Sequence, residues 1–227
     1  MNKKSWNKGW DNVFSNYTWG KFPAEPLIRF ICKNYGKIDK NKKLNVLEIG
    51  CGTGANLWFL SQCKFNTYGV DGSIVALNKS KKLLKTYNVK ADLKKSDIIK
   101  LPYKNDFFDL IIDVECLYAN SENNTKIILD EVYRVMKPKS KFLSISFSTK
   151  TTGYNSGKKY KNNRHTFTNL KKGPFKKNYG IIRFIDKLTI KKLYKKFKIE
   201  KLEKVSRTYN NLKEVIEEWV ILLNKHK

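Results

Sequence analysis

Residues 44–60 read LNVLEIGCGTGANLWFL, a pattern that predicts a strand, a tight turn and the first turns of a helix. The apolar run holds one acidic residue, Glu48, and three glycines follow at alternate positions, Gly50, Gly52 and Gly54. Because such a turn carries few side chains, a ligand can approach its backbone, where free N–H groups and the helix dipole favour anionic or nucleotide-like groups. The stretch therefore predicts a cofactor site before any substrate is considered.

The segments around this stretch alternate between helical and strand-like spacing of apolar residues. This alternation predicts an α/β fold in which a parallel sheet is covered by helices on both faces. The expected helices are 25–35, 55–63, 74–86, 122–136, 187–197 and 210–217. The expected strands are 44–49, 65–71, 88–93, 109–113, 141–148, 199–209 and 217–225. Only residues 149–186, a basic segment with little apolar periodicity, break the pattern.

The composition is that of a globular protein. The chain has 227 residues, of which 41% are hydrophobic and 13% aromatic, which suits one domain with a sizeable core. No apolar run approaches the roughly 20 residues that span a bilayer, and the N-terminus lacks the apolar centre of a signal peptide. The four cysteines form no C-x-x-C pair, so we expect reduced thiols in a cytoplasmic protein and no metal centre.

The formal net charge of +27 invites a nucleic-acid partner. Only five of the 47 basic residues are arginines, however, whereas base-reading and bidentate phosphate sites favour arginine. Lysine suits any solvated surface. Three explanations stay open, namely a drift in overall composition, an anionic small substrate, and nucleic acid, which the shortage of arginine disfavours.

The glycine turn by itself fits two kinds of cofactor. Gly50-x-Gly52-x-x-Ala55 also satisfies the dinucleotide fingerprint, with Asp71 near the distance expected of a ribose-binding acid. Glu48 argues against a dinucleotide, because a strand that approaches a pyrophosphate has no use for a carboxylate two residues before the first glycine. A cofactor that carries an ammonium and a sulfonium group, in contrast, can use a carboxylate at this position.

Three further motifs follow the glycine turn in order. After LEIGCGTG (47–54) come YGVDGS (68–73), SDIIKLPYKNDFFDLII (96–112) and EVYRVMKPKSKFLSISF (131–147). With these motifs the chain resembles the class I S-adenosylmethionine-dependent methyltransferases, close to the type 11 group that acts on small metabolites. The resemblance implies a single methyltransferase domain over residues 1–227. Its fold would be Rossmann-like, with helices on both faces of a mostly parallel seven-stranded sheet whose last strand is antiparallel.

The resemblance also implies a set of residues that bind S-adenosylmethionine. Asp71 should accept hydrogen bonds from both ribose hydroxyls, Asp97 should take the adenine amino group, and Asp113 should approach the reactive methyl. Lys139-Ser140 replaces the Gly-Gly pair usual in the family, which puts the geometry of that turn in doubt. The full implied set is Glu48, Gly50, Cys51, Gly52, Gly54, Asp71, Gly72, Asp97, Ile98 and Asp113.

The remaining segments are expected to close the cofactor core at 44–148. In the N-terminal segment, 1–36, aromatic residues either pack a helix onto the domain or form a lid, since aromatic faces suit both adenine and a sulfonium. These aromatics are Trp6, Trp10, Phe14, Tyr17, Trp19 and Phe22. The basic insertion at 149–186 should cover the substrate, and residues 187–227 should add a helix and a strand hairpin.

Candidate catalytic residues are scarce, because the chain has two histidines. His226 lies at the end of the chain, so His165 in the basic insertion is the better candidate for a base, and Glu115 lies just past a strand where the acceptor should sit. Basic side chains of the insertion could hold a phosphate or carboxylate. They are Arg164, His165, Lys171, Lys172 and Arg183.

These features predict methyl transfer from S-adenosylmethionine to a small metabolite, with an anion or a sugar derivative among the candidates. An RNA methyltransferase that holds phosphates on its basic surface is the first alternative. A cofactor-binding protein without transferase activity, whose insertion contacts a partner, is the second.

Overall fold

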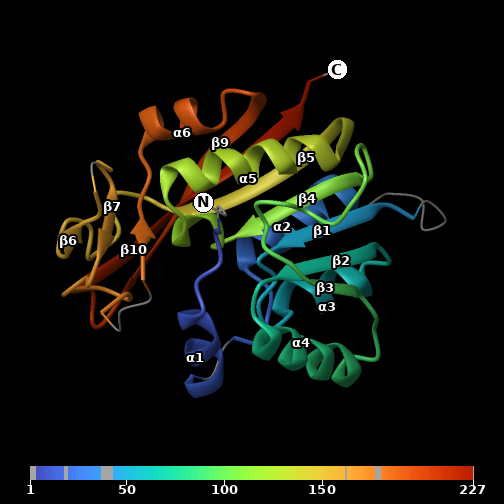
Figure 1. Ribbon diagram of the computed structural model, residues 1–227, viewed down its shortest axis with the longest axis horizontal. Coiled ribbons are helices and arrows are strands. Elements are labelled where there is room, and N and C mark those ends of the chain that lie inside the picture. Colours follow the sequence, from blue (N-terminus) through green and yellow to red (C-terminus); the bar gives the residue numbers. More distant parts are fainter. Residues whose placement is uncertain (1–3, 18–19, 37–42, 162, 177–179, 227) are drawn as a thin grey trace.

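A seven-stranded sheet forms the centre of the computed structural model, which describes residues 4–17, 20–36, 43–161, 163–176 and 180–226 (Figure 1). The strand order is β3-β2-β1-β4-β5-β10-β9. Neighbouring strands are parallel from β3 to β5, and β10 is antiparallel to both of its neighbours. The predicted class I methyltransferase sheet is thus confirmed. Its strands are β1 (Asn45–Ile49), β2 (Asn66–Asp71), β3 (Asp92–Lys95), β4 (Phe108–Val114), β5 (Met136–Phe147), β9 (Phe197–Tyr209) and β10 (Glu214–Lys225).

Helices connect the strands, and three of them, α4, α5 and α6, start at a polar side-chain cap. Ser73, Ser121 and Asp186 each accept a hydrogen bond from the backbone N–H three residues further on, which satisfies one free donor of the first turn of α4, α5 and α6. The helices are α1 (Gly9–Asn16), α2 (Glu25–Tyr35), α3 (Ala55–Gln62), α4 (Ile74–Thr86), α5 (Glu122–Val135), α6 (Lys187–Leu193) and the 3-10 turn η1 (Leu117–Ala119).

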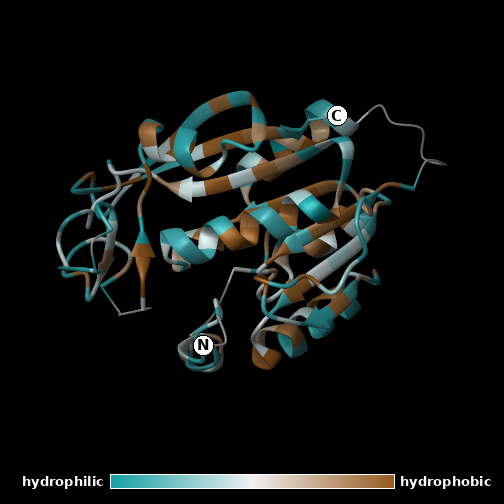
Figure 2. Cartoon of the chain, turned by 45° about the horizontal axis from the view of Figure 1, so that its top comes forward, coloured by the Kyte–Doolittle hydropathy of each residue, from teal (hydrophilic) through white to brown (hydrophobic). Residues whose placement is uncertain are grey.

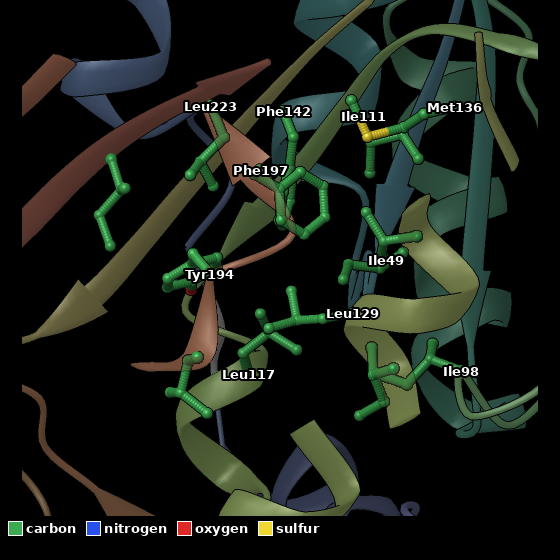
Figure 3. Packing of buried hydrophobic residues seen from close by; sticks show 14 of the residues in the cluster. Ile49, Ile98, Ile111, Leu117, Leu129, Met136, Phe142, Tyr194, Phe197 and Leu223 are labelled. Carbon is green, nitrogen blue, oxygen red and sulfur yellow. The ribbon is translucent and has the colours of Figure 1, made fainter. Parts of the chain in front are cut away.

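The core lies on both faces of the sheet. Successive strand side chains point to opposite faces, so Ile111 of β4 packs beneath α5 and α6, whereas Leu110 and Ile112 pack against α2. Figure 3 shows the first of these clusters, where Leu129 of α5 lies near Phe142 and Ile49 of the sheet. Hydrophilic and hydrophobic residues are mixed along the helices and strands, because an element with one buried and one solvated face needs both kinds (Figure 2).

The prediction of a helix at 210–217 is wrong. Asn210, Asn211 and Leu212 take positive φ angles of 52°, 52° and 66°, and β10 begins at Glu214. Asparagine tolerates the left-handed conformation better than most residues. The segment is therefore a tight turn that joins β9 and β10 into a long hairpin.

Strand β5 also starts earlier than the predicted 141. It pairs with β4 at Met136 and again from Lys141, with an irregularity between them. Lys139 lies in this irregularity with a φ of 63°. The position at which the family resemblance leads us to expect glycine therefore has a left-handed backbone, although a lysine occupies it.

The insertion at 149–186 has a structure of its own in its described part. A small antiparallel sheet, with strand order β6-β7-β8, lies beside one end of the main sheet (Figure 1). Its apolar side chains are irregularly spaced, which is why no periodicity shows in the sequence. They pack with Tyr118 and Phe147 into a separate buried cluster that includes Phe167, Leu170, Phe175, Ile182 and Phe184. The strands are β6 (Lys158–Lys159), β7 (Thr166–Thr168) and β8 (Ile182–Arg183).

Neither a membrane span nor a metal cluster is found where the structure is described. Among the described residues, no helix has the length and apolar content needed to cross a bilayer. The same residues contain no group of three or more His, Cys, Asp or Glu side chains placed to hold a metal ion.

Candidate active site

A cavity of about 740 Å³ opens at the carboxyl ends of β1, β2 and β4. Ligands of open α/β sheets bind at this edge. The glycine turn and the β2–α4 loop line one part of the cavity, and the N-terminal segment covers them. The loop after β4, the insertion and the β9–β10 hairpin line the other part. The two parts of the cavity therefore have walls formed by different elements.

The turn after β1 brings the backbone to the cavity surface. Gly50, Gly52 and Gly54 have φ angles of 63°, 51° and 85°, in the left-handed region that favours glycine. At Gly50 the space is also limited, because a Cβ there would collide with the side chain of Cys116. The turn thus contacts the loop after β4 directly, and a ligand on the turn would lie beside that loop. Cys51, predicted with the glycines, is buried and lines the cavity as well.

Glu48 is a buried acid with one unused oxygen. Its side chain is 2% exposed and lines the cavity. The Asn56 amide donates to Oε1 at 2.6 Å, and Oε2 has no hydrogen-bond partner among the described residues. Burial raises the pKa of Glu48 to about 8, and the nearby Asp71 and Asp113 carboxylates add to this effect. A buried, unpartnered carboxyl oxygen at the cavity wall is suited to a cationic ligand group.

Asp71, at the end of β2, ties the glycine turn to the next loop. Its Oδ2 accepts the Gly52 N–H at 2.9 Å and its Oδ1 accepts the Ser73 N–H at 2.8 Å. Burial raises the pKa of Asp71, and these backbone hydrogen bonds partly offset the increase. The carboxylate lines the cavity, where its remaining lone pairs can accept hydroxyl donors.

The N-terminal segment covers Asp97. The backbone N–H groups of Ser5 and Trp6 donate to Asp97 Oδ2 at 2.8 and 3.2 Å, and the Ser5 hydroxyl also contacts this carboxylate. Asp97 is not among the residues that line the cavity, whereas its neighbour Ile98 is. The carboxylate expected to take the adenine amino group therefore holds the N-terminal segment in place.

Four of the six N-terminal aromatic residues, which were predicted either to pack a helix onto the domain or to form a lid, line the cavity. The Trp6 indole occupies the space into which a Cβ of residue 72 would project, so Gly72 permits its close approach. Trp10, Phe14 and Phe22 also line the cavity. Tyr17 is partly exposed, and Trp19 lies outside the described residues.

Asp113 is fully buried and supports the loop after β4 from behind. It accepts the N–H groups of Cys116 and Leu117 at 3.0 and 3.1 Å and the Ser144 hydroxyl at 2.6 Å. Burial raises the pKa of Asp113 to about 6, against the lowering effect of these hydrogen bonds. Asp113 itself does not line the cavity; Val114, Glu115 and Cys116 do.

Two carboxyl groups meet in the second part of the cavity. Glu115 has a φ of 54°, and its carboxyl group neighbours that of Glu218 on β10. Burial, followed by the adjacent Glu218, raises the pKa of Glu115 well above its usual value. Glu218 is 2% exposed, and its Oε2 accepts from Arg207 Nη1 at 3.0 Å. Glu218 and Arg207 were not predicted from the sequence. The one indication for Glu218 was its position directly before the long apolar run of β10.

The basic residues predicted to bind an anion are not brought to the cavity. His165 is buried in the insertion, with Nδ1 at 2.8 Å from the Tyr154 hydroxyl and Nε2 at 3.1 Å from Asp186 Oδ2. Arg183 is buried too, and donates to the carbonyl oxygens of Leu117 and Ser121 at 2.9 and 3.3 Å. His165 therefore joins parts of the insertion to each other, and Arg183 ties the insertion to the loop after β4. Arg164, Lys171 and Lys172 are exposed and do not line the cavity.

Comparison with known proteins identifies a family and two relatives. A family model described as a methyltransferase domain matches residues 40–215. An uncharacterized protein of Methanocaldococcus jannaschii is 33% identical over 125 residues, which are 55% of this chain and 50% of that protein. The demethylmenaquinone methyltransferase of Oceanobacillus iheyensis is 27% identical over 155 residues, which are 62% of this chain and 61% of that protein. The chain thus aligns with about half to three fifths of the length of these relatives.

A solved structure supports the same fold. A SAM-dependent methyltransferase of Methanosarcina mazei superimposes with a TM-score of 0.73, at 17% identity, over 90% of this chain and 99% of that one.

Proposed function

Because this chain belongs to the methyltransferase domain family, we propose that it transfers a methyl group from S-adenosylmethionine to a small molecule bound in the same cavity. The observation that carries the proposal is the unpartnered Oε2 of Glu48 beside the glycine turn. A buried acid of this kind is costly unless a cation joins it. The amino group of the methionine part of S-adenosylmethionine would be that cation.

The residues of the first part of the cavity fit the rest of the cofactor. Gly50 and its neighbours would let the methionine part lie against the turn, and Asp71 would accept the ribose hydroxyls. Ile98 and Trp6 would contact the adenine ring, because both line the cavity and Gly72 leaves space for the indole. When bound, the cofactor supplies an electrophilic methyl group on sulfur, so the enzyme has to align the acceptor and exclude water.

The second part of the cavity favours an acceptor with an apolar body. Tyr118, Phe147 and Phe175 line it and form a compact aromatic group, with centroids of Tyr118 and Phe147 at 5.0 Å and of Phe147 and Phe175 at 4.7 Å. Aromatic walls exclude water and suit a flat or aliphatic molecule. An acceptor that presents a phosphate here would meet two glutamates and one arginine, Arg207, which is already paired with Glu218, rather than the basic residues predicted in the insertion.

Isothermal titration calorimetry tests the cofactor directly. We expect S-adenosylmethionine and S-adenosylhomocysteine to bind at one site with micromolar affinity, and NAD⁺ not to bind. Binding of NAD⁺ without either of the other ligands would overturn the proposal. Incubation of the protein with methyl-labelled cofactor and fractionated cell extract then identifies the acceptor, since the label appears in one fraction.

A further inference from the structure

The second part of the cavity contains a chemical group that the cofactor does not need. We propose that Glu115 and Glu218 bind and deprotonate an amine on the acceptor, so that the product is an N-methylated amine whose apolar body, about the size of an aromatic ring, lies between the aromatic walls. This inference rests on the proposed function and names its substrate class.

Glu218 provides the acceptor of the proton. It projects from β10 opposite Phe147 of β5, and its side chain is 2% exposed. Arg207 holds Oε2, whereas Oε1 has no hydrogen-bond partner among the described residues, although Glu218 lines the cavity. A buried carboxylate oxygen of this kind requires a donor, and an ammonium group provides donors and the opposite charge.

Glu115 places this pair next to the methyl-transfer position. The loop that carries it runs on to Cys116, whose side chain is in contact range of any atom added to Gly50. An amine held by Glu115 and Glu218 is therefore at the boundary between the glycine turn and the aromatic walls. Burial and the neighbouring Glu218 raise the pKa of Glu115, and the Arg207 guanidinium donates to Glu218 Oε2 at 3.0 Å, so a positive charge lies beside this carboxyl group. Asp113, from behind, adds a further negative charge.

The proton and electron changes balance within this site. The acceptor enters as an ammonium ion and gives one proton to Glu218 Oε1, which frees a lone pair on nitrogen. That lone pair forms the bond to the methyl carbon while the carbon–sulfur bond breaks, and the electrons of the broken bond remain on sulfur as a thioether. The methylated nitrogen keeps a positive charge, and Glu218 later returns its proton to solvent.

The matched series benzylamine, benzyl alcohol and benzoate tests the proposal, because the three share an aromatic body and differ in one group. Each is titrated by calorimetry into the full chain saturated with S-adenosylhomocysteine. We expect benzylamine to bind at least tenfold more tightly than either of the others. Glu218→Gln should weaken benzylamine at least tenfold and leave benzyl alcohol unchanged. Glu115→Gln provides a second variant should Glu218→Gln not fold.

The neighbouring Glu217→Gln is the matched control. Glu217 faces away from the cavity, where it accepts from Ser148 Oγ at 2.6 Å and Lys204 Nζ at 2.7 Å. It should leave all three affinities unchanged. The inference is overturned if benzoate or benzyl alcohol binds as tightly as benzylamine, if benzylamine does not bind the saturated protein, or if folded Glu218→Gln and Glu115→Gln bind it as the wild type does. Absence of S-adenosylhomocysteine binding would instead contradict the proposed function.

Discussion

Glu48 is a residue at which function and stability oppose each other. Its unpartnered Oε2 favours a bound cation, yet the same buried carboxyl weakens the fold when it ionises. We expect Glu48→Gln to lower affinity for S-adenosylmethionine by roughly ten- to a hundredfold, since a charge-assisted contact is worth about 1.5–3 kcal/mol. Calorimetry measures this change. Glu203→Gln, an exposed acid on β9, is the control and should bind normally; equal affinity of Glu48→Gln and wild type would refute the role of Glu48.

Gly50 is the position where the turn tolerates a side chain least. Alanine there would need a left-handed φ of 63° and would collide with Cys116. We expect Gly50→Ala to lower the free energy of unfolding by about 1–3 kcal/mol and to abolish measurable cofactor binding. Thermal denaturation and calorimetry check both effects. Gly20→Ala, at a position with no atom within 4 Å of an added Cβ, should unfold like the wild type; the same result for Gly50→Ala would contradict the assigned strain.

The residues of the cavity differ in how well their place could be predicted from the sequence. Glu48 lies two residues before the glycine turn and Asp71 lies in the next motif, YGVDGS, so both could be predicted from the sequence. Both line the cavity. Glu218 reaches the same cavity from the far end of the chain, through the pairing of β10 with β5. His165 had the right chemistry for a base, but its place was decided by packing inside the insertion, which no local pattern encodes.

At the scale of elements, the N-terminal segment and the core form one site. The Ser5 and Trp6 N–H groups anchor the segment on Asp97, and the Trp6 indole packs on Gly72. We expect Trp6→Ala and Asp97→Ala each to weaken cofactor binding by roughly five- to a hundredfold, because stacking of a base on an aromatic ring is worth about 1–3 kcal/mol. Since both changes release the same segment, the double variant should lose little more than either single one.

Calorimetry on the four proteins of this cycle measures the coupling, and tryptophan fluorescence on cofactor addition reports the contact independently. Lys8→Ala, which changes an exposed residue of the same N-terminal segment, is the control. Fully additive losses would show that Asp97 acts on the cofactor itself rather than through the segment.

Helices and strands were predicted well where the apolar residues repeat at a regular spacing. They were predicted poorly where a backbone turn determines the local structure. The alternating segments from β1 to α5 appear within a few residues of the expected bounds, because their buried faces repeat regularly. The turn at Asn210 and Asn211 reads as a polar helix in sequence, since left-handed φ angles leave no periodic signal. The insertion likewise folds through scattered aromatic residues that meet only in three dimensions.

At the scale of the whole molecule, positive charge lies outside and buried acids lie inside. The formal net charge is +27, while Glu48, Asp71, Asp113 and Glu115 all have pKa values raised by burial. Groups of this kind bind protons more tightly in the native than in the unfolded chain. Stability is therefore fully present below the unfolded pKa, near 4, and falls as pH rises toward the folded values of about 6 for Asp113 and about 8 for Glu48.

Because the pKa values of these buried acids are raised, we expect the protein without cofactor to melt at a lower temperature at pH 8 than at pH 6. Glu48→Gln should match the wild type near pH 4.5 and exceed it increasingly up to pH 8, by an amount on the order of a few kcal/mol in the free energy of unfolding. Thermal denaturation from pH 4.5 to 8.5 measures both curves. Saturation with S-adenosylmethionine should flatten the dependence of the wild-type melting temperature on pH, because the cation of the cofactor then offsets the charge of Glu48. A wild-type melting temperature that rises across the range would contradict the assignment of these acids as buried and costly. A difference between Glu48→Gln and the wild type that stays constant with pH would contradict it as well.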